Sequence, residues 1–247
     1  MEICWHHYFS LDSTNDKALK AVAAGKMHEG EVVWADEQWQ GKGTGQNSWE
    51  SDAGKNLSFS LVLEPHFILP SEQFLLTQVV SLAIQQVLDR RIGAYTCQIK
   101  WPNDLYISSK KVGGILIQNL IKGSSFSASV VGVGINVNQE VFHSDAPNPA
   151  SMIHFSEMEI ELFPLLEEVI QQIDFFYEKI KDRNQRVFVQ DAYLNLLIQK
   201  GSWASYSDKQ GAFEGRIVKV DDFGRLQIED RKGTLRLYGF KEVIFER

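Results

Sequence analysis

Cysteine is scarce in this 247-residue sequence, which has only Cys4 and Cys97. The two lie far apart, and neither belongs to a Cys/His spacing typical of zinc sites. We therefore expect no disulfide framework and no zinc site. Scarce, unpaired cysteine also fits a reducing compartment, which predicts a cytoplasmic protein.

Excess positive charge and long apolar runs are absent too. With 25 Lys and Arg against 32 Asp and Glu, the net charge is −7, which argues against a nucleic-acid partner bound by bulk electrostatics. No apolar run approaches the roughly 20 residues that span a bilayer, and residues 1–7 lack the basic and apolar segments of a signal peptide. The apolar fraction of 44% predicts a packed protein with room for one sizeable domain and a small one.

One stretch, residues 98–118, organises the rest of the chain and reads as strand, tight turn, strand, turn, strand. Pro102 enforces the first break, so that residues 103–104 (Asn-Asp) lie at a polar corner. After a second turn at 108–111, glycines 113–114 lie in a buried strand and permit close approach to its backbone. We expect a lysine, the asparagine and the aspartate to converge beside bare backbone.

A glycine-rich loop at residues 41–49 follows a strand predicted at 31–35. Its alternating glycines let successive backbone N–H groups point outward, as a site for phosphate or carboxylate requires, and Lys42 adds a cation. Flexible surface loops share this composition, so the loop alone is weak evidence. Its position after a strand favours an anion site.

Two further features leave alternatives open. Ser13, Thr14 and Asn15 precede an amphipathic helix that ends at Gly25. One interpretation is that they simply cap this helix. The other is that they contact a ligand, because three polar groups exceed what one cap needs. Gly132 and Gly134 share one face of a strand and either receive a flat ligand or accommodate a side chain from the helix layer.

The pattern predicts an α+β fold, with helices packed on a mixed β-sheet and a small β domain after a boundary near 199–201. Helical periodicity covers residues 71–93, 157–182 and 183–200. Strands are predicted at 31–35, 57–63, 127–137, 215–220, 225–228 and 234–237.

Taken together, these motifs resemble biotin protein ligase, in the family's order across nearly the whole chain. The resemblance rests on Lys100-Trp101-Pro102-Asn103-Asp104, Lys111-Val112-Gly113-Gly114-Ile115-Leu116, Asp12-Ser13-Thr14-Asn15, Gln38, the loop ending in Trp49, and Gly132-Val133-Gly134-Ile135-Asn136. It implies a class II synthetase-like catalytic domain at 1–199 and an SH3-like β-barrel at 200–247. Because the Ser-Thr-Asn block starts only twelve residues in, we expect the family's optional DNA-binding domain to be absent, so the chain resembles the short form.

The resemblance implies two half-reactions. Biotin attacks ATP to give biotinyl-5′-AMP and pyrophosphate, and a lysine of a biotin carboxyl carrier protein domain, part of a biotin-dependent carboxylase, then attacks the anhydride. Neither step requires a protein nucleophile, so catalysis rests on positioning and charge stabilisation. Mg²⁺ is implied with the nucleotide. Family members often pair through a sheet edge, but no strand here demands a homodimer by its composition.

The resemblance also implies roles for individual residues. The implied catalytic residues are Lys111, Lys42 and Asp104. The implied biotin contacts are Ser13, Thr14, Gln38, Gly41, Lys42, Lys111, Gly113, Gly132 and Gly134. The implied ATP or adenylate contacts are Gly43, Thr44, Trp49, Asn103, Lys111 and Asn136. Asp104 is expected either to orient the incoming lysine, to bind Mg²⁺ with phosphate oxygens, or to form the turn.

One departure from the family stands out. The family's loop usually carries arginine at the positions of Lys42 and Thr44, so lysine keeps the charge without the bidentate fork and threonine loses the charge. This keeps a second hypothesis open, a divergent biotin- or acyl-binding protein with weak or no ligase activity. The related lipoate ligase is disfavoured because the Lys-Trp-Pro-Asn-Asp block belongs to the biotin side.

Overall fold

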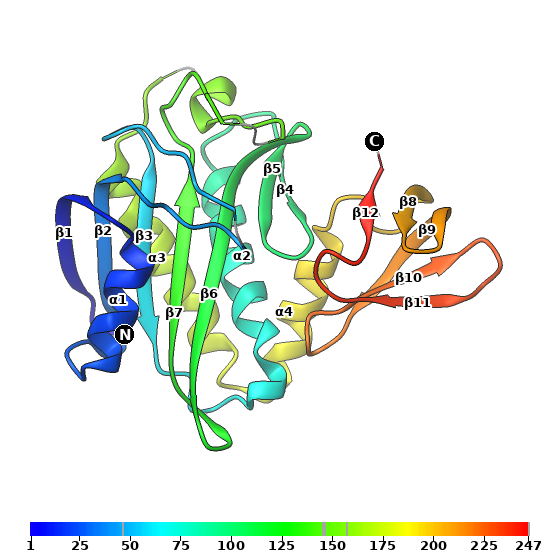
Figure 1. The fold of residues 1–247 in the computed structure, drawn as a ribbon, viewed down its shortest axis with the longest axis horizontal. Helices are drawn as coiled ribbons and strands as arrows, with labels where there is room; N and C mark the ends of the chain where they lie inside the picture. The colour runs from blue at the N-terminus through cyan, green and yellow to red at the C-terminus, as the bar shows by residue number, and fades with distance from the viewer. Residues whose placement is uncertain (46, 145–146, 157, 247) are drawn as a thin grey trace.

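The computed structural model describes residues 1–45, 47–144, 147–156 and 158–246 (Figure 1). Its larger part is a seven-stranded sheet in the order β1-β2-β3-β7-β6-β5-β4, in which β1 is parallel to β2 and the other neighbours are antiparallel. The strands of this sheet are β1 (Cys4–Leu11), β2 (Glu31–Gln38), β3 (Leu57–Leu63), β4 (Cys97–Lys100), β5 (Asp104–Ile107), β6 (Lys110–Lys122) and β7 (Ser125–Ile135). The predicted mixed sheet is confirmed.

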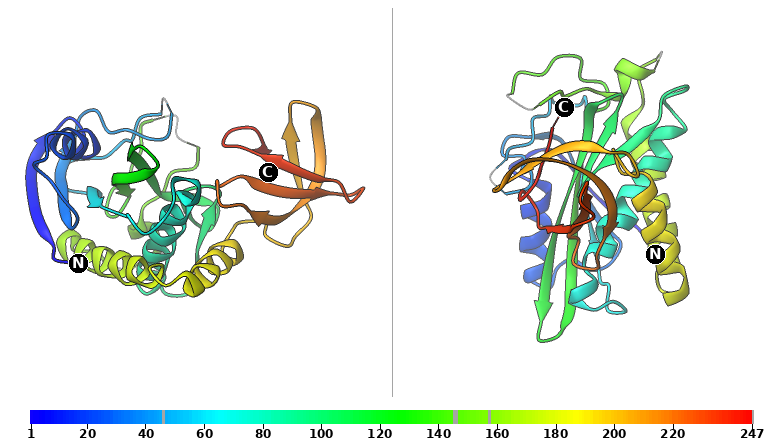
Figure 2. Two further views of the ribbon diagram at one scale, coloured as in Figure 1. Left: turned by 90° about the horizontal axis from the view of Figure 1, so that it is seen from below. Right: turned by 90° about the vertical axis from the view of Figure 1, so that its right-hand side faces the viewer.

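Helices cover both faces of this sheet (Figures 1 and 2). The helix α1 (Thr14–Ala23) packs on one face against Val33, Val62 and Val130. The helices α2 (Phe74–Asp89), α3 (Leu162–Lys179) and α4 (Arg183–Asn195) lie together with the main core. Because side chains alternate along a strand, the neighbouring residues Val32, Leu61 and Val131 face that core.

The long helices are shorter than predicted. Ser71 does not cap α2, because it lies in a 3-10 turn, Pro70–Glu72, and α2 starts after Gln73. Gly93, with φ +61°, comes four residues after the end of α2 at Asp89. The helix predicted from residue 157 begins instead at Leu162, and Glu157 lies outside the described residues.

The C-terminal strands form a separate five-stranded antiparallel sheet in the order β11-β10-β9-β8-β12. They are β8 (Ala204–Asp208), β9 (Gly211–Val220), β10 (Leu226–Asp230), β11 (Leu235–Tyr238) and β12 (Ile244–Phe245). The predicted small β domain is confirmed, and β8 and β12 are additions to the prediction. Up to residue 246 the sheet is open, with β11 and β12 as its edges.

The joint between the two sheets passes through Trp101. Its indole Nε1–H donates to the backbone oxygen of Gly224, 2.9 Å away, in the turn between β9 and β10. Gly224 has φ +84°, and a Cβ there would lie 2.4 Å from the Phe74 ring at the start of α2. The second sheet therefore docks by glycine backbone against an aromatic side chain.

Among the residues that the structure describes, no helix is both long and apolar enough to cross a membrane. The cytoplasmic location stays a prediction.

We expect Gly224→Ala to weaken the protein more than Gly233→Ala. Both glycines have positive φ in turns of the small sheet, but a Cβ at Gly233 meets nothing within 4 Å. Gly233→Ala should lower the free energy of unfolding by about 1 kcal/mol through backbone strain alone. Gly224→Ala should lower it by about 1–3 kcal/mol more, because its methyl group overpacks Phe74. Equal losses in urea unfolding would show that this contact does not hold the joint.

Candidate ligand-binding site

A cavity lies where the glycine loop, the start of α1 and the strands β5, β6 and β7 meet. All predicted site residues except Gly41, Gly113 and Asn136 line it. The lining consists of Ser13, Thr14, Asn15, Gln38, Lys42, Gly43, Thr44, Trp49, Phe59, Asn103, Asp104, Lys111, Gly114, Ile115, Leu116, Gly132, Val133 and Gly134.

The parallel pairing of β1 and β2 builds one polar end of this cavity. Leu11 and Gln38 are register partners at the ends of the two strands, so the start of α1 lies beside Gln38. The Thr14 backbone N–H donates to Gln38 Oε1 at 2.7 Å, and Ser60 Oγ donates to Thr14 Oγ1 at 2.9 Å. The side-chain oxygen of Gln38 is therefore occupied, and since none of the described residues hydrogen-bonds its NH₂ group, that group is left for a ligand.

The polar block before α1 divides its roles. Ser13 is the N-cap, with its Oγ accepting from the Asp16 N–H at 3.4 Å, so the capping interpretation is confirmed for this residue. Asn15, which the sequence left open, donates through Nδ2 to Leu116 O at 3.2 Å. Its Oδ1 is buried without a partner among the described residues. A buried acceptor facing a cavity suits a ligand that carries an N–H group.

Gly132 is the position that admits Asn15. A Cβ on Gly132 would lie 2.4 Å from Asn15 Nδ2, so any larger residue would displace that side chain. The interpretation that this glycine accommodates a side chain from the helix layer is therefore confirmed.

The predicted convergence of lysine, asparagine and aspartate is confirmed. Lys111 Nζ lies 2.7 Å from Asp104 Oδ1, and each side chain is between a quarter and a third exposed. Asn103 Nδ2 donates to Ile115 O and to Thr44 Oγ1, the latter at 3.0 Å. Lys111 and Asp104 thus place a cation and a carboxylate at the cavity wall. The Asn103 amide links β6 to the glycine loop beside them.

A tyrosine from α4 holds the turn that carries these groups. Tyr193 is buried, and its hydroxyl donates to Pro102 O at 2.7 Å, next to the cis peptide bond between Trp101 and Pro102. Burial raises the pKa of Tyr193 well above its ordinary value, and the charge of Asp104 adds to the rise. The tyrosine therefore stays a neutral donor. Helical periodicity marked it only as a core residue.

The glycine loop is a small hairpin. The Gly43 N–H donates to Asn47 O at 2.7 Å, and the Trp49 N–H donates to Gly41 O at 2.9 Å. In this conformation the Gly43 amide is engaged within the loop and Gly41 lies outside the cavity lining, and the role of both amides in holding an anion stays a prediction. Lys42 Nζ pairs with Asp16 Oδ2 at 2.6 Å. Gln46, in the same loop, lies outside the described residues.

Trp49 covers the glycine strand. A Cβ on Gly134 would lie 2.4 Å from the indole ring, and the indole Nε1 is buried without a partner among the described residues. With the ring in place, the cavity has a volume of only about 50 Å³, far below the roughly 300–1,000 Å³ of small-molecule sites. The surface predicted for a flat ligand is thus occupied by a protein side chain that must move to admit one.

Two predicted contacts lie away from the cavity. A Cβ on Gly113 would meet Leu105 Cδ1 at 3.1 Å, so this position faces the core, and Gly114 lines the cavity in its place. Asn136 is buried and donates through Nδ2 to Ala150 O at 3.0 Å. Its contacts hold the segment after β7 and do not reach the cavity.

A second cavity, of about 250 Å³, lies between the two sheets. It shares Thr44, Asn103, Ile115 and Leu116 with the first, so the two cavities lie next to each other. Its remaining lining residues are Phe74, Thr77, Trp101, Pro102, Ile117, Phe223, Gly224, Arg225, Gly239 and Phe240. This lining supplies several aromatic faces and the Arg225 guanidinium.

The fold and the site define an α+β small-molecule-binding protein whose pocket offers fixed hydrogen-bonding groups and a lysine but, in its described lining, no cysteine or histidine. The model of the biotin/lipoate A/B protein ligase family matches residues 8–136, more than half of the chain. The chain belongs to this family.

Individual relatives agree with the family match. The bifunctional ligase/repressor BirA of Bacillus subtilis is 29% identical over 242 residues, which cover 94% of this chain and 71% of the relative. The biotin--[acetyl-CoA-carboxylase] ligase of Paracoccus denitrificans is 38% identical over 128 residues, covering 51% of each chain. The biotin protein ligase of Aquifex aeolicus, solved with biotin and ATP, superposes with a TM-score of 0.80 at 23% identity over 98% of each chain, which shows a shared fold.

We expect Trp49→Ala to open the glycine loop. Limited proteolysis of the ligand-free variant should cut between Gly43 and Lys55 about tenfold faster than in wild type. A tenfold rise corresponds to a loss of about 1.4 kcal/mol in the free energy that favours the closed loop over the open one. Trp39→Ala is the matched control, because Trp39 is 64% exposed just before the loop. Equal acceleration in both variants, or in neither, would show that the buried ring does not hold the loop.

Proposed function

We propose that this chain activates biotin with ATP and transfers it to a lysine of a biotin carboxyl carrier protein domain. A biotin carboxylate oxygen forms a bond to the α-phosphorus while the bond to pyrophosphate breaks, giving biotinyl-5′-AMP. The carrier amine then attacks the acyl carbon, loses its proton, and AMP leaves. The Lys111–Asp104 pair, at the wall of the first cavity, is the observation that carries the proposal.

The polar end of the first cavity matches a cyclic urea. A ureido group offers two N–H donors and one carbonyl acceptor. Asn15 Oδ1, which is buried without a partner among the described residues, would accept from one N–H, and the Gln38 NH₂ group would donate to the carbonyl. Leu116 and Val133 give the middle of the cavity an apolar wall for the rest of the ligand.

Lys111 would supply the charge stabilisation. Its ammonium lies at the cavity wall on the rigid strand β6, where it would face the biotin carboxylate and the α-phosphate. Negative charge on the phosphoryl oxygens grows as the pentacoordinate phosphorus forms, and a fixed cation lowers the energy of that state. In the free protein, Asp104 balances this charge.

Asp104 is then available for one of two roles. When Lys111 pairs with the phosphates instead, the Asp104 carboxylate would accept a hydrogen bond from the incoming carrier amine. This bond would orient the lone pair of the amine. Magnesium usually binds through one or two carboxylates plus substrate phosphates, so a single aspartate beside the phosphate position also fits a Mg²⁺ brought with ATP.

The cavity between the sheets would take the adenosine. Its volume of about 250 Å³ and its aromatic lining, including Trp101, Phe223 and Phe240, suit a stacked base. Asn103 contacts both cavities and would hold the phosphate between them. The small sheet thereby becomes part of the nucleotide site.

The loss of a loop arginine at Thr44 favours a second candidate, a biotin-binding protein that does not ligate. Lipoate is the other acyl group that the name of the family contains. The relatives reported above are biotin ligases or BirA by name. The Asn15 acceptor and the Gln38 donor match a ureido group, which lipoate lacks, so biotin is the better fit.

Biotin-dependent exchange between ATP and pyrophosphate tests the proposal. Wild type should catalyse it, and Lys111→Ala should lower its rate by about 10²–10³, the usual effect of removing one preorganised donor. Lys110→Ala should be nearly neutral, because Lys110 is exposed at the adjoining turn. Exchange in neither wild type nor variants, with biotin still bound, would support the second candidate. Equal losses at both lysines would refute the role of Lys111.

The missing loop charge has a candidate replacement in the small sheet domain. A Cβ on Gly45 would lie 2.9 Å from Lys241 Nζ, so that ammonium lies beside the residue next to Thr44. Lys241 lies between β11 and β12 of the small sheet, whereas Lys42 is paired with Asp16 of α1. We propose that Lys241 holds the ligand's negative charge in place of the family's arginine.

Lys241→Ala should therefore weaken biotin-dependent exchange at subsaturating ligand by roughly ten- to a hundred-and-fifty-fold, the effect of losing a charged hydrogen bond of about 1.5–3 kcal/mol. Adding Thr44→Arg to that variant should restore much of the loss, whereas Thr44→Arg alone should change little. Lys209→Ala is the control, because Lys209 is an exposed lysine in the turn between β8 and β9 of the same small domain. A neutral Lys241→Ala would rule out this replacement.

A further inference from the structure

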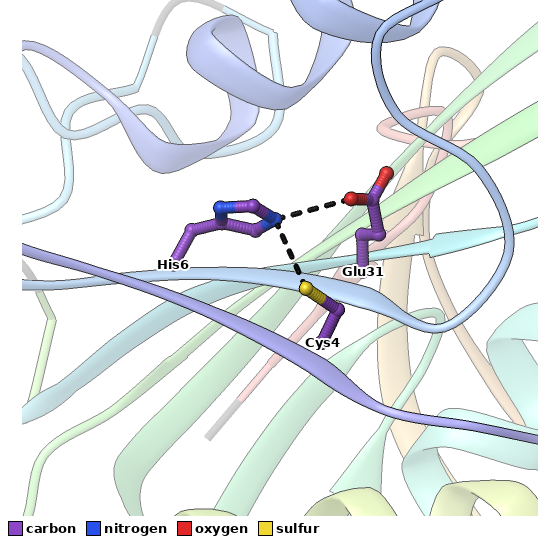
Figure 3. A group of neighbouring side chains, drawn as sticks. All are labelled: Cys4, His6 and Glu31. Carbon is purple, nitrogen blue, oxygen red and sulfur yellow. Dashed lines mark hydrogen bonds and ion pairs between the residues drawn. The ribbon is translucent and has the colours of Figure 1, made fainter.

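A cluster of three metal-ligating side chains lies on the large sheet, away from the site described above. Cys4 and His6 project from β1 and Glu31 from β2 (Figure 3). Their ligand atoms all lie within 4.8 Å of one another. Cys4 therefore has a histidine and a glutamate beside it, although its spacing in the sequence is not one typical of zinc sites.

The two distances from His6 Nε2 match those of a tetrahedral metal site, and the third pair of atoms lies within 4.8 Å. His6 Nε2 lies 3.7 Å from Cys4 Sγ and 3.2 Å from Glu31 Oε1. Zinc bonds of about 2.3 Å to sulfur and about 2.0–2.2 Å to nitrogen and oxygen place tetrahedral ligand atoms about 3.6 Å (S to N) and about 3.4 Å (N to O) apart. A proton on Nε2 cannot point at sulfur and oxygen together, whereas one cation between them satisfies all three atoms.

Sheet geometry fixes this arrangement. Cys4 and Glu31 are register partners on parallel strands, and His6 follows Cys4 by two residues on the same face. Trp5 and His7 face the other way, toward Phe163 and Trp34. The second carboxylate oxygen of Glu31 accepts from the His28 backbone N–H at 2.6 Å, which aims its first oxygen at His6. A ligand held this way is oriented before the metal arrives.

We propose that Cys4 Sγ, His6 Nε2 and Glu31 Oε1 bind one divalent transition-metal ion of the zinc class. A thiolate, an imidazole and a carboxylate are ligands that this class accepts, and hard cations such as magnesium avoid thiolate. Partial exposure of the cluster leaves a fourth position for water. The ion would cross-link the edge strand β1 to β2, and binding to the folded state alone would stabilise the protein.

Metal titration of the tag-free, reduced full-length chain tests the proposal. Co²⁺ should give one thiolate-to-metal charge-transfer band that saturates at one ion per chain, and Zn²⁺ should abolish it. Cys4→Ser should remove the band, because Cys97 is buried and cannot replace the thiolate. His6→Gln and Glu31→Gln should each weaken Zn²⁺ binding, measured against a chromophoric chelator, by more than the roughly 10–100-fold of an outer-shell change.

His7→Gln is the matched control. His7 is a histidine of the same strand with its own carboxylate partner, Asp36 at 3.0 Å, but it faces the opposite side of the sheet. Its loss should leave both the band and the affinity unchanged. No charge-transfer band in wild type, or equal losses for His6→Gln and His7→Gln, would overturn the proposal and leave a surface hydrogen bond between His6 and Glu31. The readout is metal binding, so it is independent of the proposed ligase activity.

Discussion

The contact between Lys111 and Asp104 is the interaction on which the site depends. Both side chains are partly exposed, and ion pairs of this kind contribute about 0–1 kcal/mol to stability. The importance of the pair is therefore positional. It holds an ammonium group at the wall of the first cavity, and the rigid β5–β6 hairpin fixes where that group lies.

That hairpin also explains why the neighbouring glycines have different roles. Its register shifts between Leu105 and Tyr106, so that Gly114, opposite Asp104, faces the cavity and Gly113 faces the core. A shift of one residue exchanges the two faces of a strand. The sequence shows two adjacent glycines but not the bulge, so the motif alone could not decide which one lines the site.

The sequence predicts two kinds of feature: elements with strong hydrophobic periodicity, and groups of site residues that are close together in the sequence. The strand at 57–63 was predicted with its observed bounds, and the Lys-Trp-Pro-Asn-Asp turn was placed correctly. The small strand β12, with two residues, carries too short a pattern to detect.

Other features of the site depend on contacts between distant segments. The hairpin within the glycine loop engages the Gly43 amide, and the Trp49 ring occupies the surface over Gly134, although the composition of the loop predicted open amides. The cavity between the sheets exists because Trp101 meets Gly224, two residues that no local pattern connects. Lys241 likewise reaches the loop only through the docking of the small sheet.

The edge strand β1 connects the metal-ligating cluster to the ligand site. In the seven-stranded sheet it pairs with β2 alone, and it leads directly into the polar block at the start of α1. Its first residue lies opposite Glu31 and its last opposite Gln38, so the same ladder that gathers the cluster at one end sets the distance from Thr14 to Gln38 at the other. An edge strand frays more readily than a central one because it has one hydrogen-bonded neighbour. A cross-link at the start of β1 would therefore restrict the motion of the groups that hold the ligand at its end, without touching the ligand itself.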